Sequence, residues 1–514
     1  MKMTKMTLLT AIILPGLGGC HVALQSYRVQ HPAIEVSPPP IAPAAVAAAT
    51  SPAKDCVDPK SPICLAFIEV DDMGELFDKG ELDTALRIIR QANDLANAEP
   101  GQSDPVVITF IHGWKNNASP ENDNVKGFTA ALQEVYKSFN GAHRVIGIYI
   151  GWRGNLIKSY FPVSQQFSYF NREATATRIP GATLSSALTQ IATRTHENQR
   201  ALAIFIGHSF GGLLLERTLS ETTASQIAEA SIYAQEAQET QDSKVTGDKA
   251  LAARLAVDSR ADLVIFINPA GAATEAKQML DFLTYNRYRY HPQQEPQPAT
   301  PESNETERPL FVSLTSTADM ATKVALPIGH SLPYLGFQSN GSFRDLNQEP
   351  NKKYDLTCFD PQNKEHAYWE LKTKEEGAVA QGSYYLSSAP HMQVLQSHEM
   401  LKSVGANQMR VASTGQTIQI QDPNAIANCD RALFNKQGLN IVSTFKLYDT
   451  QACFAVQVRP NRCNGTPYWL MEIDPDVVPD HSTIFTQRFI HFIIDTFFAP
   501  NGKPLQRLSP QLTH

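Results

Sequence analysis

The sequence lacks the patterns that would indicate a cofactor or a nucleic-acid surface. It has no G-x-x-x-x-G-K-[ST] phosphate loop, no H-E-x-x-H zinc motif, no dinucleotide fingerprint and no cysteines at C-x-x-C spacing. Its 44 lysines and arginines are outnumbered by 51 aspartates and glutamates and form no basic run, which argues against a nucleic-acid surface. We therefore expect no metal, nucleotide or redox cofactor and no nucleic-acid partner.

The first 19 residues have the composition of a secretory signal peptide. Two lysines precede an apolar run at 8–17, which is too short to span a bilayer. The run ends in LGGC at 17–20, which resembles a bacterial lipobox and implies that Cys20 is lipidated and becomes the new N-terminus. His21, where another sorting signal has Asp, suggests the outer membrane, facing the periplasm. The alternative is an ordinary secretory signal with a chance cysteine.

Residues 20–55 are expected to form a tether, because 32–53 is rich in proline and alanine. Proline keeps such a segment extended, so about 35 residues could hold the folded part up to about 100 Å from the membrane. A second low-complexity stretch at 291–309 is predicted to be a surface loop.

Six cysteines remain when Cys20 is set aside, which in an oxidising periplasm fits up to three disulfides. Cys56 and Cys64 are separated by a short proline-containing loop, and theirs is the one pairing that we predict. Buried free thiols are the alternative. The other four are Cys358, Cys429, Cys453 and Cys463.

With 42% apolar residues among 514, the chain can bury a sizeable core. Its apolar runs alternate with helical patterns, and each run has the length of a strand that is buried on both faces. The spacing leaves room for crossover helices, for example at 128–139 and 210–219. The pattern predicts an α/β fold with a doubly wound, mostly parallel sheet. The predicted strands are 63–70, 106–111, 145–150, 201–206, 263–267, 310–314 and 468–473.

A G-x-S-x-G motif, formed by Gly207, Ser209 and Gly211, directly follows the predicted strand 201–206. Glycines are needed where a strand turns sharply into a helix, because larger neighbours would collide in the strained turn that presents the serine. The following helix also favours negative charge beside the serine oxygen. Ser209 is therefore the candidate nucleophile, and the alternative is a glycine-rich turn with an incidental serine.

Four segments together resemble the alpha/beta-hydrolase superfamily, and within it a group described as esterases or lipases. They are FIHGWKNNA at 110–118, GWRG at 151–154, GHSFGG at 207–212 and STADMAT at 316–322. The resemblance covers residues 63–335 and 468–498 and implies a serine hydrolase with an alpha/beta-hydrolase type of sheet.

By this resemblance, the pair His112-Gly113 after strand 106–111 belongs to the loop that forms part of the oxyanion hole. The donors are then the backbone N–H groups of Trp114 and of Phe210, the residue after the nucleophile. For His112 we favour a packing or hydrogen-bonding role that holds the loop. The side chain of Trp114 could simply belong to the core or to a pocket wall.

The resemblance also implies a triad in the chain order serine, acid, histidine. Asp319 follows strand 310–314 and is the candidate acid, although an aspartate here could instead cap the next helical segment. His481 lies in the loop after strand 468–473 and is the candidate base, which would exchange protons with Ser209. Its neighbour Asp480 is a minor alternative acid.

Other candidates fit less well. Asp262 precedes its strand and does not follow it, so it is a poor candidate for the acid. His491 lies within a helical pattern and is expected to pack, whereas His391 and His398 are expected on the surface or in a lid.

The predicted organisation has five parts. One part is an insertion at 336–467, between the candidate acid and the candidate base. It holds four of the six remaining cysteines, so we expect a disulfide-supported cap over the pocket. The alternative, to which we give nearly equal weight, is a separate addition on the side of the core away from the pocket. The segment 221–258 is expected to be an exposed helical excursion. The parts are a signal peptide at 1–19, the lipidated tether at 20–55, the first part of the core at 56–335, the insertion at 336–467 and the last strand and helix at 468–514.

The leading hypothesis is a lipid-anchored serine hydrolase of the bacterial cell envelope that cleaves carboxylic esters through an acyl-enzyme. Its substrate would be a small-molecule or lipid ester, and its membrane partner would be reached through Cys20. One alternative is a non-catalytic envelope protein that uses the fold for binding, since a fold alone does not establish an activity. A thioesterase or amidase with the same triad is the other alternative.

Overall fold

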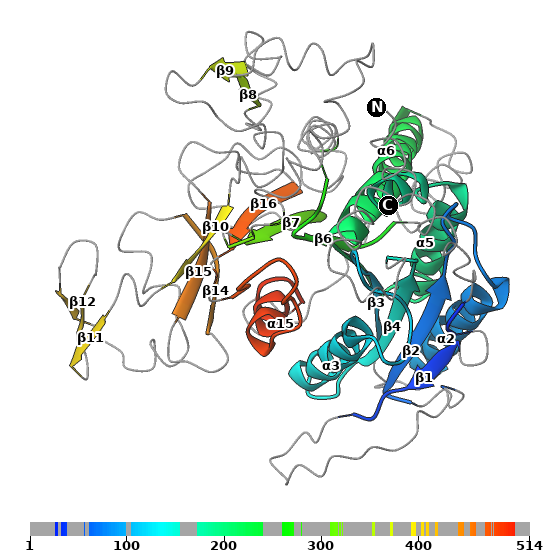
Figure 1. Cartoon of the computed structure of the whole chain (residues 1–514), viewed down its shortest axis with the longest axis horizontal. Coiled ribbons are helices and arrows are strands. Elements are labelled where there is room, and N and C mark those ends of the chain that lie inside the picture. Colours follow the sequence, from blue (N-terminus) through cyan, green and yellow to red (C-terminus); the bar gives the residue numbers. More distant parts are fainter. Residues whose placement is uncertain are drawn as a thin grey trace, which may run out of the picture.

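The computed structural model describes the parts of the chain that form the sheet and its helices (Figure 1). Between 352 and 458 it describes the backbone of short strands. Elsewhere the described residues are 26–28, 32–38, 56, 61–98, 104–154, 172–239, 260–271, 279, 309–316, 318, 319, 321, 468–473, 475 and 477–498.

One mixed sheet of eleven strands organises the fold, in the order β1-β2-β4-β3-β5-β6-β7-β16-β10-β15-β14 (Figure 1). Neighbouring strands are parallel from β2 to β10, and antiparallel pairs occur at the two ends. The expected mostly parallel α/β sheet is therefore confirmed. Its first eight strands are β1 (Ala33–Glu35), β2 (Ile63–Glu69), β3 (Pro105–Ile111), β4 (Arg144–Gly151), β5 (Leu202–His208), β6 (Leu263–Ile267), β7 (Phe311–Ser316) and β16 (Tyr468–Ile473).

Helices cover both faces of this sheet. On one face, α2 (Lys79–Ala98), α5 (Ala182–Thr195) and α6 (Phe210–Glu239) pack in one apolar cluster with the sheet. On the other face lie α3 (Asp123–Ser138) and α15 (Gln487–Ile493), which continues as a π-helix at Ile494–Phe498. Every residue of β2, β3 and β4 is buried, because side chains of both faces meet helices. Burying one large apolar side chain contributes about 1.5–3 kcal/mol.

The predicted helices exist and are longer than the apolar pattern indicated. The segment predicted at 128–139 begins earlier, at Asp123, where the Asn122 side chain accepts a hydrogen bond from the N–H of Asn124. The polar excursion expected from residue 221 is a continuation of α6 as far as Glu239. Its remainder, and the loop at 291–309, lie outside the described residues.

The predicted insertion at 336–467 contributes strands to the main sheet. Its strands β10 (Met392–Gln396), β15 (Cys453–Val458) and β14 (Asn440–Lys446) continue the sheet beyond β16. A cap over the pocket stays a prediction, because most of the insertion lies outside the described residues. Two small sheets hold its other strands, β8 (Lys352–Tyr354), β9 (Leu371–Thr373), β11 (Lys402–Gly405), β12 (Gln408–Arg410) and β13 (Thr417–Gln419).

The tether predicted at 20–55 is wrong for the residues that the structure describes. Strand β1 pairs antiparallel with β2, and the Phe67 N–H donates to the Pro32 carbonyl oxygen at 2.8 Å. Ala33 and Val36 are 5% and 4% exposed. The prolines do not prevent this pairing, because β1 is at the edge of the sheet, where a missing N–H leaves no neighbour unpaired.

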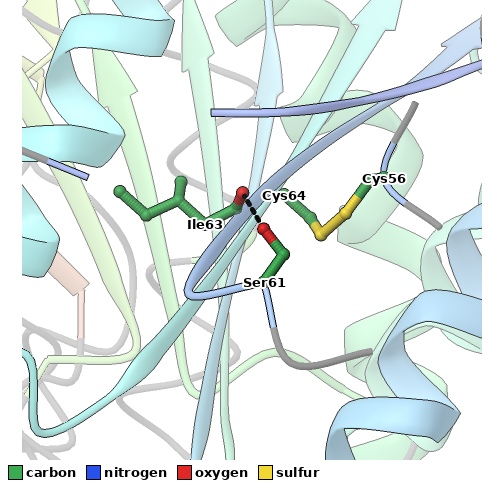
Figure 2. The surroundings of a disulfide bond; sticks show 4 residues. All are labelled: Cys56, Ser61, Ile63 and Cys64. Carbon is green, nitrogen blue, oxygen red and sulfur yellow. Dashed lines mark hydrogen bonds between the residues drawn. A yellow bond between two sulfur atoms is a disulfide. The ribbon is translucent and has the colours of Figure 1, made fainter. Parts of the chain in front are cut away.

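The cysteine pair predicted from spacing is brought together beside this strand. The sulfurs of Cys56 and Cys64 lie at bonding distance, with their Cα atoms 5.9 Å apart (Figure 2). Ser61, in the intervening loop, donates from Oγ to the Ile63 carbonyl oxygen at 3.3 Å. Cys20 lies outside the described residues. In the described part, no helix has both the length and the apolar character needed to cross a bilayer.

Candidate active site

The three side chains predicted to form a triad lie in loops that follow three strands of the sheet. Ser209 follows β5, Asp319 lies just beyond β7, and His481 lies beyond β16. The order β5-β6-β7-β16 is entirely parallel, so the carboxyl ends of these strands share one edge. Ligand sites of open α/β sheets lie at this edge.

Ser209 occupies a strained turn between β5 and α6. Its φ of 55° is in the left-handed region, which residues other than glycine rarely adopt. A Cβ atom at Gly207 would lie 2.6 Å from the Gly211 carbonyl oxygen, and one at Gly211 would collide with the Ile111 carbonyl oxygen. The glycines of the motif are therefore required by close backbone packing. The Ser209 N–H donates to the Ile267 carbonyl oxygen at 3.0 Å, which ties the turn to β6.

The three side chains form one hydrogen-bonded chain. Ser209 Oγ lies 2.8 Å from His481 Nε2, and His481 Nδ1 lies 2.9 Å from Asp319 Oδ2. Asp319 is fully buried and Ser209 is 6% exposed, whereas the His481 side chain is 21% exposed. Because the Asp319 carboxylate accepts a hydrogen bond from Nδ1–H, Nε2 is left as the acceptor for the serine hydroxyl. This arrangement can remove the proton of Ser209 during an attack on a carbonyl carbon.

His112 is held as a neutral, structural group. It is fully buried and stacks on Trp152 with ring centroids 5.7 Å apart. Its Nδ1 donates to the Gly113 carbonyl oxygen at 2.9 Å, while Nε2 accepts from the Trp152 N–H at 3.0 Å. Burial lowers its pKa to about 4. These contacts agree with the expected loop-holding role.

The loop after β3 runs directly beside the serine. A Cβ atom at Gly113 would lie 2.8 Å from Ser209 Cβ and 3.0 Å from the His208 carbonyl oxygen, so a larger residue does not fit there. Trp114 follows in this loop, and Phe210 is the first residue of α6. Their backbone N–H groups as oxyanion donors stay a prediction.

Two residues that sequence reasoning missed hold the His481 loop. The His481 carbonyl oxygen accepts hydrogen bonds from His208 Nε2 at 2.8 Å and from Asn268 Nδ2 at 3.2 Å. The Asn268 side-chain oxygen accepts the Ser316 N–H at 2.9 Å. Burial, and then the charge of His481, lower the pKa of His208 to about 3, so it is a neutral donor. The sequence signal that could have found Asn268 is its place as a polar residue directly after the apolar strand β6.

Ser316 also links the loop that carries Asp319 to the loop that carries His481. Its Oγ donates to the Val478 carbonyl oxygen at 2.6 Å and accepts the Ala318 N–H at 3.1 Å. Asp319 in turn accepts the Ala321 N–H at 2.9 Å. The Asp319 and His481 loops are therefore fixed to each other as well as to the sheet.

The alternative candidates lie in other environments. Asp480 accepts the N–H groups of Ser482 and Thr483; partial burial opposes ionisation, but the Thr483 hydrogen bonds lower its pKa overall. Asp262 lies at the amino end of β6 and contacts His196 Nε2 at 2.9 Å. His491 faces the Glu134 carboxylate at 3.5 Å on the helical face. His391 and His398 lie outside residues with described side chains.

Comparisons of the chain with protein-family models, with curated proteins and with solved structures found no match. The likeness to hydrolases therefore rests on the chain's own motifs. Within the described residues, no group of three or more histidine, cysteine or acidic side chains is placed to hold a metal ion.

Proposed function

We propose that the protein is a serine hydrolase that cleaves carboxylic esters through an acyl-enzyme. Ser209 Oγ attacks the ester carbonyl carbon while His481 Nε2 takes its proton. The imidazolium then protonates the departing alcohol, and a water molecule activated by the same nitrogen hydrolyses the acyl-enzyme. Asp319 fixes the His481 tautomer and stabilises the imidazolium. Backbone N–H groups of Trp114 and Phe210 stabilise the oxyanion, each contributing about 3–4 kcal/mol.

The observation that carries this proposal is the continuous hydrogen-bonded chain from Ser209 to Asp319. Both of its contacts are shorter than 3 Å, and the serine stands in a left-handed turn at the start of a helix. A glycine-rich turn with an incidental serine needs neither a histidine nor a buried carboxylate in line with the hydroxyl. The chain order of serine, acid and histidine also supports an alpha/beta-hydrolase type of fold.

Covalent labelling tests this function directly. The full-length chain in detergent is treated with a fluorophosphonate, which phosphonylates an activated serine with loss of fluoride, and its intact mass is measured. Ser209→Ala should prevent the single adduct, whereas Ser482→Ala, beside the base but without a role in proton transfer, should keep it. A labelled Ser209→Ala variant would overturn the mechanism.

The labelling experiment also separates the alternatives. A folded chain that takes up no fluorophosphonate favours a non-catalytic binding protein. If an adduct forms, a panel of esters, thioesters and amides with matched acyl groups distinguishes an esterase from a thioesterase or amidase. We further propose that lipidated Cys20 anchors the chain in the bacterial cell envelope, at the outer membrane facing the periplasm. Mass analysis of the tryptic N-terminus tests this anchor.

A further inference from the structure

The segment that follows the predicted lipid attachment site is fastened to the folded body within a few residues. Glu69 Oε1 accepts hydrogen bonds from Ser26 Oγ at 2.6 Å, from the Tyr27 N–H at 2.6 Å and from the Arg28 N–H at 2.8 Å. Such charge-assisted hydrogen bonds are stronger than neutral ones. Glu69 itself is 4% exposed, so one buried carboxylate holds three successive residues.

Arg28 fixes the same segment to a second place. Its Nε donates to the Ala118 carbonyl oxygen at 2.7 Å, and its guanidinium lies 3.6 Å from the centre of the Phe67 ring. Ala118 lies within the loop between β3 and α3, and Gly113 of the same loop packs against Ser209. The anchor segment is therefore bound to the loop system of the candidate active site.

These contacts lie at the same edge of the sheet as Ser209. Glu69 is the last residue of β2 and pairs with Gly151 at the end of the parallel strand β4. Strands β4 and β3 separate β2 from β5. Three strand spacings amount to about 14 Å along the edge.

The covalent distance to the lipid is short. From Cys20 to Ser26 there are six chain steps, which extend to about 21 Å at most. This reach is about a fifth of the 100 Å that a free tether over residues 20–55 would allow. Two large apolar side chains are exposed in the segments on either side of these contacts: Tyr27, whose N–H binds Glu69, at 52%, and Met73, in the turn after β2, at 62%. Tyrosine at such a place is typical of residues at a bilayer interface.

We propose that the carboxyl edge of the sheet faces the membrane that holds the anchor, and that the enzyme hydrolyses amphiphilic esters drawn from that membrane. The substrate class rests on the proposed esterase function, whereas the orientation rests on the contacts of residues 26–28 and on lipidation. Tyr27 and Met73 then lie at the bilayer interface. Ser209 then lies at the edge of the sheet that faces the lipid headgroups.

The orientation is tested by energy transfer, which needs no activity. The lipidated chain is reconstituted into phosphatidylcholine–phosphatidylglycerol vesicles that contain headgroup-labelled acceptor lipids. A donor is attached at Met73→Cys, at the carboxyl edge, or at Arg200→Cys, which precedes β5 at the opposite edge. Labelling of other cysteines is subtracted with the parent chain. Seven strand residues span about 23 Å, so transfer should be clearly stronger from position 73. Equal or weaker transfer there would overturn the orientation.

The substrate class is tested by lengthening the anchor. A 30-residue Gly/Ser segment inserted between Gln25 and Ser26 separates lipid and body, while the same insertion between Ala47 and Ala48 lengthens the chain without changing the distance from Cys20 to Ser26. The first insertion should lower hydrolysis of 4-methylumbelliferyl palmitate in the vesicle on the order of tenfold. Hydrolysis of water-soluble 4-methylumbelliferyl acetate should not change. The second insertion should leave both rates intact.

The outcomes separate the two proposals. If the two insertions have the same effect on the ratio of palmitate to acetate hydrolysis, or no effect, the membrane substrate is refuted although the esterase stands. If neither ester is cleaved and the fluorophosphonate leaves the serine unlabelled, the esterase and its substrate class fall together. The energy-transfer result then still decides the orientation.

Discussion

The strongest stability prediction concerns Glu81, which lies beneath the docked N-terminal segment. Its side chain is fully buried, and Oε2 accepts the Glu69 N–H at 2.6 Å. Burial raises its pKa to about 7, and the charges of Glu69 and Asp78 act in the same direction. Arg28, the nearby cation, contacts Glu69 through its backbone and points its guanidinium at Ala118 and Phe67. Glu81→Gln replaces the carboxyl with a group that stays neutral at every pH.

The direction of the pH dependence of stability follows from whether the folded or the unfolded chain binds the Glu81 proton more tightly. The folded pKa of Glu81 is above its ordinary value of 4.5, so unfolding releases a proton between pH 4.5 and about 7. The stability that protonated Glu81 contributes is fully present below pH 4.5 and is lost as the pH rises through about 7. Each pH unit between the two pKa values is worth about 1.4 kcal/mol, so the loss is at most about 3 kcal/mol. Glutamine should therefore stabilise the fold at pH 8 by up to this amount.

Urea unfolding followed by tryptophan fluorescence at pH 5 and pH 8 measures the difference. The parent chain and Glu81→Gln should unfold at similar urea concentrations at pH 5, and the variant should be the more stable at pH 8. Glu121→Gln, at an exposed carboxyl, should follow the parent at both values. A variant that is less stable than the parent at pH 8 would refute the reasoning, because it would show that Glu81 is needed as a carboxylate.

The remaining predictions concern ester turnover. His481→Ala should abolish kcat, whereas His491→Ala should leave it within a few-fold, because His491 faces Glu134; the reverse pattern moves the base. Asp319→Asn should lower kcat by about 10⁴, because the amide no longer favours the Nδ1–H tautomer, and unchanged turnover would exclude Asp319 as the acid. Asn268→Ala should lower kcat about tenfold with KM nearly unchanged, since one hydrogen bond that positions His481 is lost. A rise in KM alone would instead assign Asn268 to substrate binding.

The central strands could be predicted because their sequence signal is local. The apolar run at 201–206 corresponds to β5 and the run at 106–111 to β3, and both are buried on two faces by helices. The glycines around Ser209 also carried a local signal, because each is required by backbone atoms that lie too close for a Cβ. The hydrogen-bonded partners Asp319 and His481 could be named only through the resemblance to alpha/beta-hydrolases, which implies an acid and a histidine after late strands.

The anchoring contacts could not be predicted because they join distant residues. Glu69 ends an apolar strand and looks like the beginning of a solvated turn, although its carboxylate binds residues 41–43 positions earlier. Proline-rich composition correctly excludes a helix at 32–38, but it does not exclude an edge strand. Asn268 and the His481 carbonyl are 213 positions apart, and no periodicity connects them.

The pairing of β7 with β16 explains how a long insertion leaves the site intact. All six residues of β16 pair in parallel with all six of β7, from Tyr468 with Phe311 to Ile473 with Ser316. The register therefore fixes the distance between the loops that carry Asp319 and His481, whatever the chain does between them. Ser316 and Asn268 then bond these loops at the strand ends. Because the positions depend on strand register, sequence changes within the insertion should alter access to Ser209 before they alter the geometry of the hydrogen-bonded chain.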